Sequence, residues 1–189
     1  MRYQTLFLPL VSLAIVGACT DQPTSPTAPT DFATLSAAVT PATRTEFAGF
    51  IHFCESAPFE NVRLTPGSTL HLDGARNQNL WVTGNPLVDG IAENVVGGMI
   101  NLNNGTGVGH LEVAVTPEAV EGTWEIKSTV KIVGGAPGGS RGVGHGTGEL
   151  DGMTIRYTAE PPVFGQNSCN PNMGSAPVQG VITSPATSD

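Results

Sequence analysis

The stretch from residue 121 to residue 160 constrains the fold more than any other part of the chain. Between Trp124 and Val133 apolar and polar residues alternate, so that Trp124 and Ile126 share one face and Glu125 lies on the other. A period of two residues is typical of a β-strand with one buried and one solvated face. We expect this strand to open an antiparallel meander of three strands.

A loop of glycine, alanine, proline and serine over residues 134–140 interrupts the alternation. The second strand, expected at 141–150, then places four glycines on the same face as Leu150, namely Gly142, Gly144, Gly146 and Gly148. We expect this face to point inward, where the missing side chains leave room for Trp124 and Tyr157 or for a ligand. Asp151-Gly152 predicts a type I′ hairpin turn into a third strand at 153–160.

The rest of the chain favours an all-β fold. Glycine (24 residues) and proline (15 residues) separate short strand candidates at near-regular spacing, a pattern typical of a sandwich or a barrel. The candidates are 46–54, 60–64, 68–73, 79–83, 97–103, 108–115, 121–133, 141–150, 153–160 and 178–183. We predict an antiparallel up-and-down β-barrel of about eight strands, with a β-sandwich as the alternative.

A resemblance supports the barrel. The run Gly122-Thr-Trp124 followed by a strand, and then Gly-His-Gly-Thr-Gly-Glu-Leu-Asp-Gly-Met153, looks like the core of small bacterial barrels similar to allene oxide cyclase and dirigent proteins. It covers residues 121–160 and implies a closed antiparallel barrel. It carries over no catalytic residue, because none matches by position.

The N-terminus predicts export. Arg2 precedes an apolar run over residues 6–16 that is too short to cross a bilayer as a helix, so residues 1–18 resemble a signal peptide. Its end, Val16-Gly17-Ala18-Cys19, resembles the lipobox of bacterial lipoproteins, which implies lipidation of Cys19 and anchoring to the membrane of the cell envelope, facing the periplasm or the surface. The alternative is an ordinary cleaved signal with a chance cysteine.

Composition then divides the rest of the chain. Residues 19–45 are rich in threonine, proline, alanine and serine and predict a disordered tether. Residues 46–189 predict a single β-barrel domain. Within that domain Cys54 and Cys169 are the remaining cysteines, and an oxidising compartment favours a disulfide between them over two free thiols.

The charge excludes one class of partner. The chain has 8 basic and 16 acidic residues and no basic cluster, so we expect no nucleic-acid binding.

The four histidines do not converge with short spacing, so we predict no metal site. Gly138-Gly-Ser140-Arg-Gly142 matches a nucleophile elbow, but a strand follows it where that motif needs a helix. We expect no cofactor.

What remains is the lumen of the barrel, which in eight strands holds side chains or one small ligand. The residues that could line a site for a small apolar ligand are the aromatic residues and the one histidine with apolar neighbours on its face: Trp81, Trp124, Tyr157 and His52. We favour a non-catalytic module that binds a small molecule or interacts with an envelope component. The alternatives are a cyclase or isomerase that uses Tyr157 or His52 as acid or base, and a purely structural surface lipoprotein.

Overall fold

The computed structural model describes residues 42–186, and the predicted signal peptide, Cys19 and nearly all of the predicted tether lie outside them. The described chain forms a 10-stranded antiparallel sheet. Its strands are β1 (Arg44–Ser56), β2 (Asn61–Thr65), β3 (Thr69–Val82), β4 (Gly90–Asn101), β5 (Thr106–Pro117), β6 (Trp124–Val133), β7 (Ala136–Gly146), β8 (Thr154–Ala159), β9 (Val163–Phe164) and β10 (Gly174–Thr183), with a 3₁₀ turn η1 at Gly148–Leu150.

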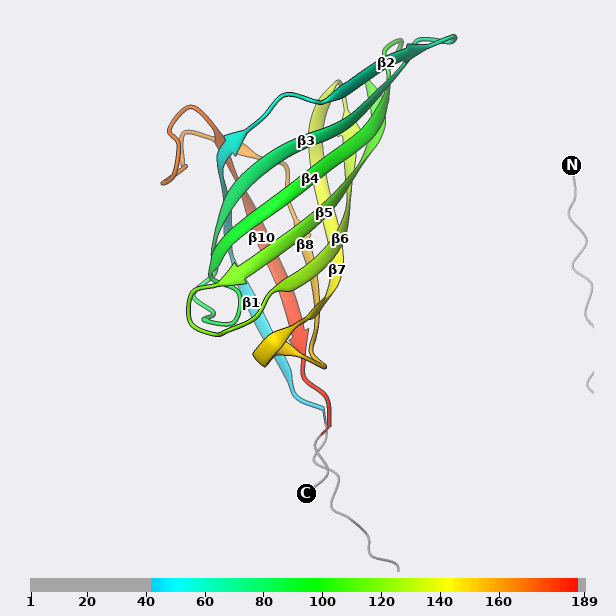
Figure 1. Cartoon of the computed structure of the whole chain (residues 1–189). Helices are drawn as coiled ribbons and strands as arrows, with labels where there is room; N and C mark the ends of the chain where they lie inside the picture. Colours follow the sequence, from blue (N-terminus) through cyan, green and yellow to red (C-terminus); the bar gives the residue numbers. More distant parts are fainter. Residues whose placement is uncertain (1–41, 187–189) are drawn as a thin grey trace, which may run out of the picture. The chain divides into compact units, whose positions relative to one another are not determined.

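The sheet closes into a barrel, which confirms the predicted fold class (Figure 1). Neighbouring strands run in the order β3, β4, β5, β6, β7, β8, β10 and β1, and β1 then pairs with β3 to complete a ring of eight. The β-sandwich alternative does not form, because β1 bonds to both of its neighbours in the ring. The short strands β2 and β9 lie outside the ring, on β3 and β10.

Strands β3 and β4 are longer than expected, because polar residues and a bulge hid their continuity. Residues 68–73 and 79–83 belong to the single strand β3, which bends at an irregularity between Leu72 and Ala75. Gly74 adopts φ +80° there, which suits a glycine at a bulge. Strand β4 begins at Gly90, seven residues before the expected strand, although Asp89-Gly90 resembles a turn.

The meander of residues 121–160 forms as expected, with corrections at its turns. The first turn holds only Gly134 and Gly135, and β7 already begins at Ala136. Strand β7 ends at Gly146, and η1 carries Leu150 inward. Asp151 has φ −56° and Gly152 φ +76°, so this turn is of type II rather than the predicted type I′, which needs positive φ at both residues.

One end of the barrel is closed by loops. Val88 and Leu150 are buried there, and both belong to the core cluster. The Asp89 carboxylate holds the 83–89 loop in place, since it accepts hydrogen bonds from the Thr83 amide (2.6 Å) and the Gly84 amide (2.9 Å). Strand β1 starts and β10 finishes at this closed end, where Arg44 pairs with Thr183.

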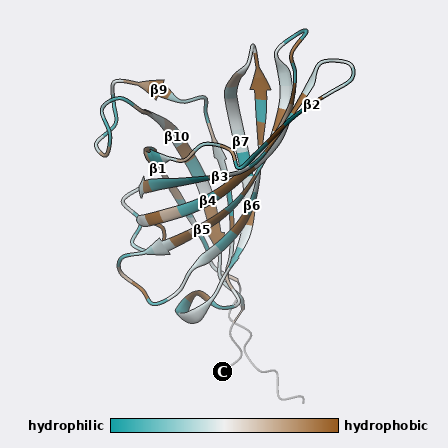
Figure 2. Cartoon of the chain, turned by 45° about the horizontal axis from the view of Figure 1, so that its top comes forward, coloured by the Kyte–Doolittle hydropathy of each residue, from teal (hydrophilic) through white to brown (hydrophobic). Residues whose placement is uncertain are grey.

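The opposite end is open, because the ring is incomplete there (Figure 2). Strand β1 pairs with β3 only as far as Asn77, and β8 pairs with β7 only as far as Ser140. Beyond these points the sheet continues as β2 to β7 alone. We call this the open end; it comprises the extension of β2 to β7, its turns, and β9 with its loop.

Candidate functional site at the open end of the barrel

The three aromatic residues predicted to line the lumen do face it, but they are core residues. Trp81, Trp124 and Tyr157 are 1%, 0% and 5% exposed. The rings of Trp81 and Tyr157 meet edge to face with centroids 5.0 Å apart, a favourable aromatic geometry. The Trp124 indole N–H donates a hydrogen bond of 2.6 Å to the Leu87 carbonyl in the loop of the closed end. These contacts fix the rings against the protein itself.

The space beside the inward-facing glycines of β7 is also occupied by protein atoms. A Cβ added at Gly142 would lie 2.3 Å from Tyr157 Cε1, and one at Gly144 would lie 2.6 Å from Ile126 Cγ1. At Gly146 the nearest side-chain atom would be Leu150 Cβ, 2.4 Å away. Real Cβ atoms do not approach other atoms this closely, so the three glycines leave room for large neighbours in the core. Around these glycines the barrel interior is therefore occupied by the protein's own side chains.

The Tyr157 hydroxyl is buried and hydrogen-bonded. It donates a hydrogen bond of 2.9 Å to Ser128 Oγ, and Ser128 in turn donates to the Arg141 carbonyl at 3.0 Å. Burial raises the pKa of the Tyr157 phenol above 10.0, and this outweighs the opposing effect of its hydrogen bonds to Ser128 and Ser140. A phenol with a raised pKa stays protonated at neutral pH, so it is poorly suited to act as a general base.

A layer of buried polar side chains faces the same lumen, and the sequence reasoning did not predict it. Asn79 Oδ1, Trp81 Nε1 and both side-chain polar atoms of Asn94 have no hydrogen-bond partner among the described residues. Asn79 and Asn94 lie on adjacent strands, where their registered partners are Ala92 and Asn77. Asn79 and Asn94 occupy inward-facing positions of their strands. A search for alternating apolar and polar residues does not find such positions, because it assumes that inward-facing residues are apolar.

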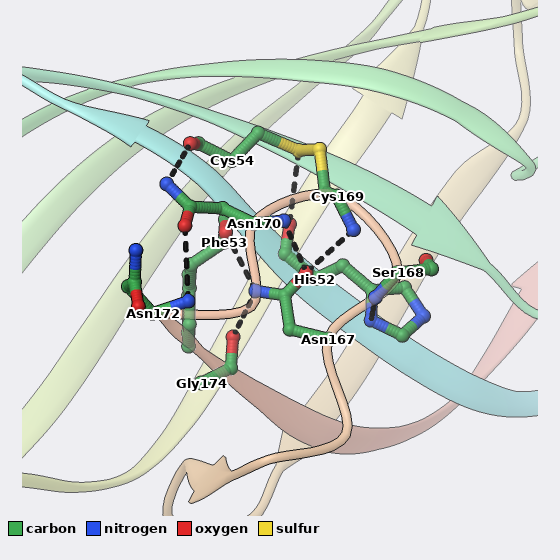
Figure 3. The surroundings of a disulfide bond; sticks show 9 residues. All are labelled: His52, Phe53, Cys54, Asn167, Ser168, Cys169, Asn170, Asn172 and Gly174. Atoms are coloured by element: carbon green, nitrogen blue, oxygen red, sulfur yellow. Dashed lines mark hydrogen bonds between the residues drawn. A yellow bond between two sulfur atoms is a disulfide. The ribbon is translucent and has the colours of Figure 1, made fainter.

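His52 lies beside the 166–170 loop, near the Cys54–Cys169 bond (Figure 3). It follows the inward Ile51 on β1, so its side chain points away from the lumen, yet it is only 8% exposed because the 166–170 loop covers it. The Ser168 amide donates to His52 Nδ1 at 3.4 Å. The structure therefore does not bring His52 together with Trp124 and Tyr157.

The predicted disulfide between Cys54 and Cys169 is present, with the two Cα atoms 5.1 Å apart. Two asparagines reinforce it (Figure 3). The Asn167 amide donates to the Phe53 and Gly174 carbonyls at 2.6 and 2.8 Å, and the Asn170 amide donates to the Cys54 carbonyl at 3.2 Å. The bond and these contacts hold the 166–170 loop on β1.

The other residues that could bind a metal or act in catalysis do not gather at one place in the described part of the chain. Within residues 42–186 no three histidine, cysteine, aspartate or glutamate side chains are grouped so as to hold a metal ion. His145 pairs with Glu125 at 3.3 Å on the exposed outer face. Ser140 of the serine motif lies within β7, where its registered partner is Ala159, and no helix follows it. The same described region contains no helix long and apolar enough to span a bilayer.

A hollow of about 1040 Å³ lies on the outer wall across β3 to β7. Exposed side chains of both charges line it, among them Glu93, Glu112, Glu125, Arg76 and Lys127. Glu112 and Lys127 are cross-strand neighbours, so part of this charge is balanced locally. The hollow has no feature that points to one ligand.

The open end carries the largest group of exposed apolar side chains. Of the twelve large hydrophobic residues exposed among the described residues, seven lie on its strands and turns: Val62, Leu64, Met99, Leu102, Val133, Val163 and Phe164. Leu64 is 62% exposed and Phe164 is 76% exposed. Exposed apolar residues scattered singly are ordinary, whereas larger contiguous apolar patches are typical of interaction sites.

Comparisons with known proteins do not assign this chain to a family. No protein-family model, curated protein or solved structure matches the chain. The site must therefore be interpreted from its residues alone.

Proposed function

We propose that this protein is a lipid-anchored module of the bacterial cell envelope that binds another envelope protein through the open end of its barrel, without catalysis. The observation that carries the proposal is the concentration of exposed apolar side chains at that end. The filled lumen argues in the same direction. The aromatic residues best suited to hold a small apolar molecule are already packed against each other and against the loop of the closed end.

The anchoring part of the proposal rests on the lipobox-like sequence before Cys19 and on the Cys54–Cys169 bond, which suits an oxidising compartment. Strand β1 begins at the closed end of the barrel, so the chain that leads to Cys19 joins the domain there. Cys19→Ser should release the protein from the membrane fraction to the soluble fraction, and unchanged membrane retention would refute lipidation.

Photo-cross-linking in cells tests the interaction. A benzophenone amino acid placed at Leu64 should give one discrete adduct with a different envelope protein. The matched control is the same group at Val143, which is 55% exposed on the outer face of β7, against 62% for Leu64. Discrete adducts confined to Leu64 support the proposal. Equal adducts at both positions, a Leu64 adduct only with a second copy of this chain, or no adduct at Leu64 would each contradict it.

A further inference from the structure

The edge of the sheet at β2 is open to another strand. Strand β1 leaves β3 after the pair Ser56–Asn77, and β2 takes its place beside the outer half of β3, from the pair Asn61–Asp73 to the pair Thr65–Thr69. Strand β2 is the last strand in the order of the sheet, so its other side pairs with no described strand. An edge strand of this kind offers unpaired backbone N–H and C=O groups.

The side chains of β2 define what such a strand would meet. Val62 and Leu64 lie on one face, where they continue the apolar row that runs through Leu72 and Leu70 of β3. Arg63 lies on the other face beside His71. Arg63 forms no ion pair with any of residues 42–186, because the salt bridges there involve other cations.

We propose that β2 accepts, by strand addition, an extended segment of the partner protein in which apolar residues alternate with an acidic residue opposite Arg63. Residues directly opposite each other in a sheet have Cβ atoms about 4.5–5.5 Å apart, and opposite charges at that distance are favourable. The apolar residues on either side of the acid would extend the row of Val62 and Leu64. Backbone hydrogen bonds supply affinity in this mode of recognition, and alternate side chains supply specificity. This inference rests on the proposed function and names the segment that the open end recognises.

A second copy of the chain fits this edge less well. The two-fold pairing that matches all five residues of β2 places Asn61 opposite Thr65 and Val62 opposite Leu64, and it therefore places Arg63 directly opposite Arg63. Like charges in that position are destabilising. Other registers pair fewer residues, and the net charge of −8 on each copy opposes association further.

Two labelled peptides test the inference by fluorescence anisotropy with the full-length chain in detergent. In the acidic peptide valines alternate with glutamates, and in the basic peptide lysines replace the glutamates. The acidic peptide should bind about 5-fold more tightly, from a charge-pair difference of about 1 kcal/mol. This preference runs against the net charge of −8, which attracts the basic peptide. Arg63→Glu should reverse it, whereas Arg156→Glu, on the exposed face of β8, should leave it unchanged.

Hydrogen exchange separates strand addition from contact by side chains alone. Binding of the acidic peptide should slow exchange of backbone amides within residues 61–65. A preference for the basic peptide, a preference that Arg63→Glu does not alter, unchanged exchange in β2, or dimerisation of the chain through β2 would overturn the inference. Leu64 adducts with another protein would still support the proposed function in that case. Absence of Leu64 adducts would refute the proposed function, whatever the result of the peptide-binding experiment.

Discussion

Substituting alanine for Gly142 tests whether the lumen is filled. The new Cβ would lie 2.3 Å from Tyr157 Cε1 and 2.9 Å from Ile126 Cγ2, so Tyr157 must move and its hydrogen bond to Ser128 must stretch or break. Overpacking of this kind costs about 1–3 kcal/mol, and loss of the hydrogen bond adds about 1 kcal/mol. Glycine to alanine recovers about 0.4–1 kcal/mol through the unfolded state. Together these contributions should lower the free energy of unfolding by about 1–4 kcal/mol.

Gly109→Ala is the matched control. Gly109 is also a buried strand glycine, but a Cβ there would lie 3.6 Å from its nearest neighbours, an ordinary van der Waals contact. Its free energy of unfolding should be unchanged or slightly higher. Urea unfolding followed by circular dichroism gives both values. Equal effects of the two substitutions, or a stable Gly142→Ala variant, would show that Tyr157 does not fill the space beside Gly142.

A double substitution makes the test specific to one contact. If the clash is with the phenol ring, Gly142→Ala should cost less in a Tyr157→Leu background than in the wild type, because the shorter side chain leaves the space free. The coupling between the two changes should be about 0.5–3 kcal/mol, the range found for residues in contact. Additive effects would place the cost of Gly142→Ala elsewhere.

Two further predictions concern stability. The Cys54–Cys169 bond closes a loop of 115 residues. By the loop-entropy model, its reduction should lower the free energy of unfolding by up to about 4.8 kcal/mol. Urea unfolding with and without reductant measures this difference, and equal stability under both conditions would contradict the model. Because the pKa of Tyr157 is raised when folded, its contribution to stability is fully present below pH 10.0 and is lost as pH rises through the folded-state pKa. Tyr157→Phe should remove that part of the alkaline loss, and an identical alkaline fall in the variant would exclude Tyr157 as its source.

The sequence predicted those parts of the fold that repeat with a period of two. Strand β6 alternates without interruption, and its predicted inward residues Trp124 and Ile126 are buried. The Cys54–Cys169 bond followed from the even number of cysteines that remain after Cys19. Both inferences use local or compositional signals that tertiary structure does not override.

Other features depended on pairing between distant residues, which local patterns do not contain. The polar run Arg76-Asn-Gln-Asn79 looks like a break, yet it continues β3 because β1 and β4 hydrogen-bond to it on both sides. Pro137 resembles a loop residue, but it lies where β7 has no neighbour on its β8 side, and proline is tolerated on such an edge. These strands are set by their neighbours rather than by their own propensities.

The candidate site at the open end was not predicted, although a strand at its edge was, and the reason is related. Alternation in residues 60–64 indicates a strand with Val62 and Leu64 on one face, and apolar residues on one face normally indicate burial. Their exposure follows from the early departure of β1 from β3, which only the register shows. His52 illustrates the reverse case, because a loop more than a hundred residues away in sequence covers it.

Tryptophan fluorescence tests the central claim that protein side chains fill the lumen around the two tryptophans. The chain has 2 tryptophans, and both Trp81 and Trp124 face the lumen, so their emission reports on the interior alone. The account predicts a blue-shifted emission that acrylamide quenches weakly. Emission like that of free tryptophan, with strong quenching by acrylamide, would contradict it by showing an open and accessible lumen.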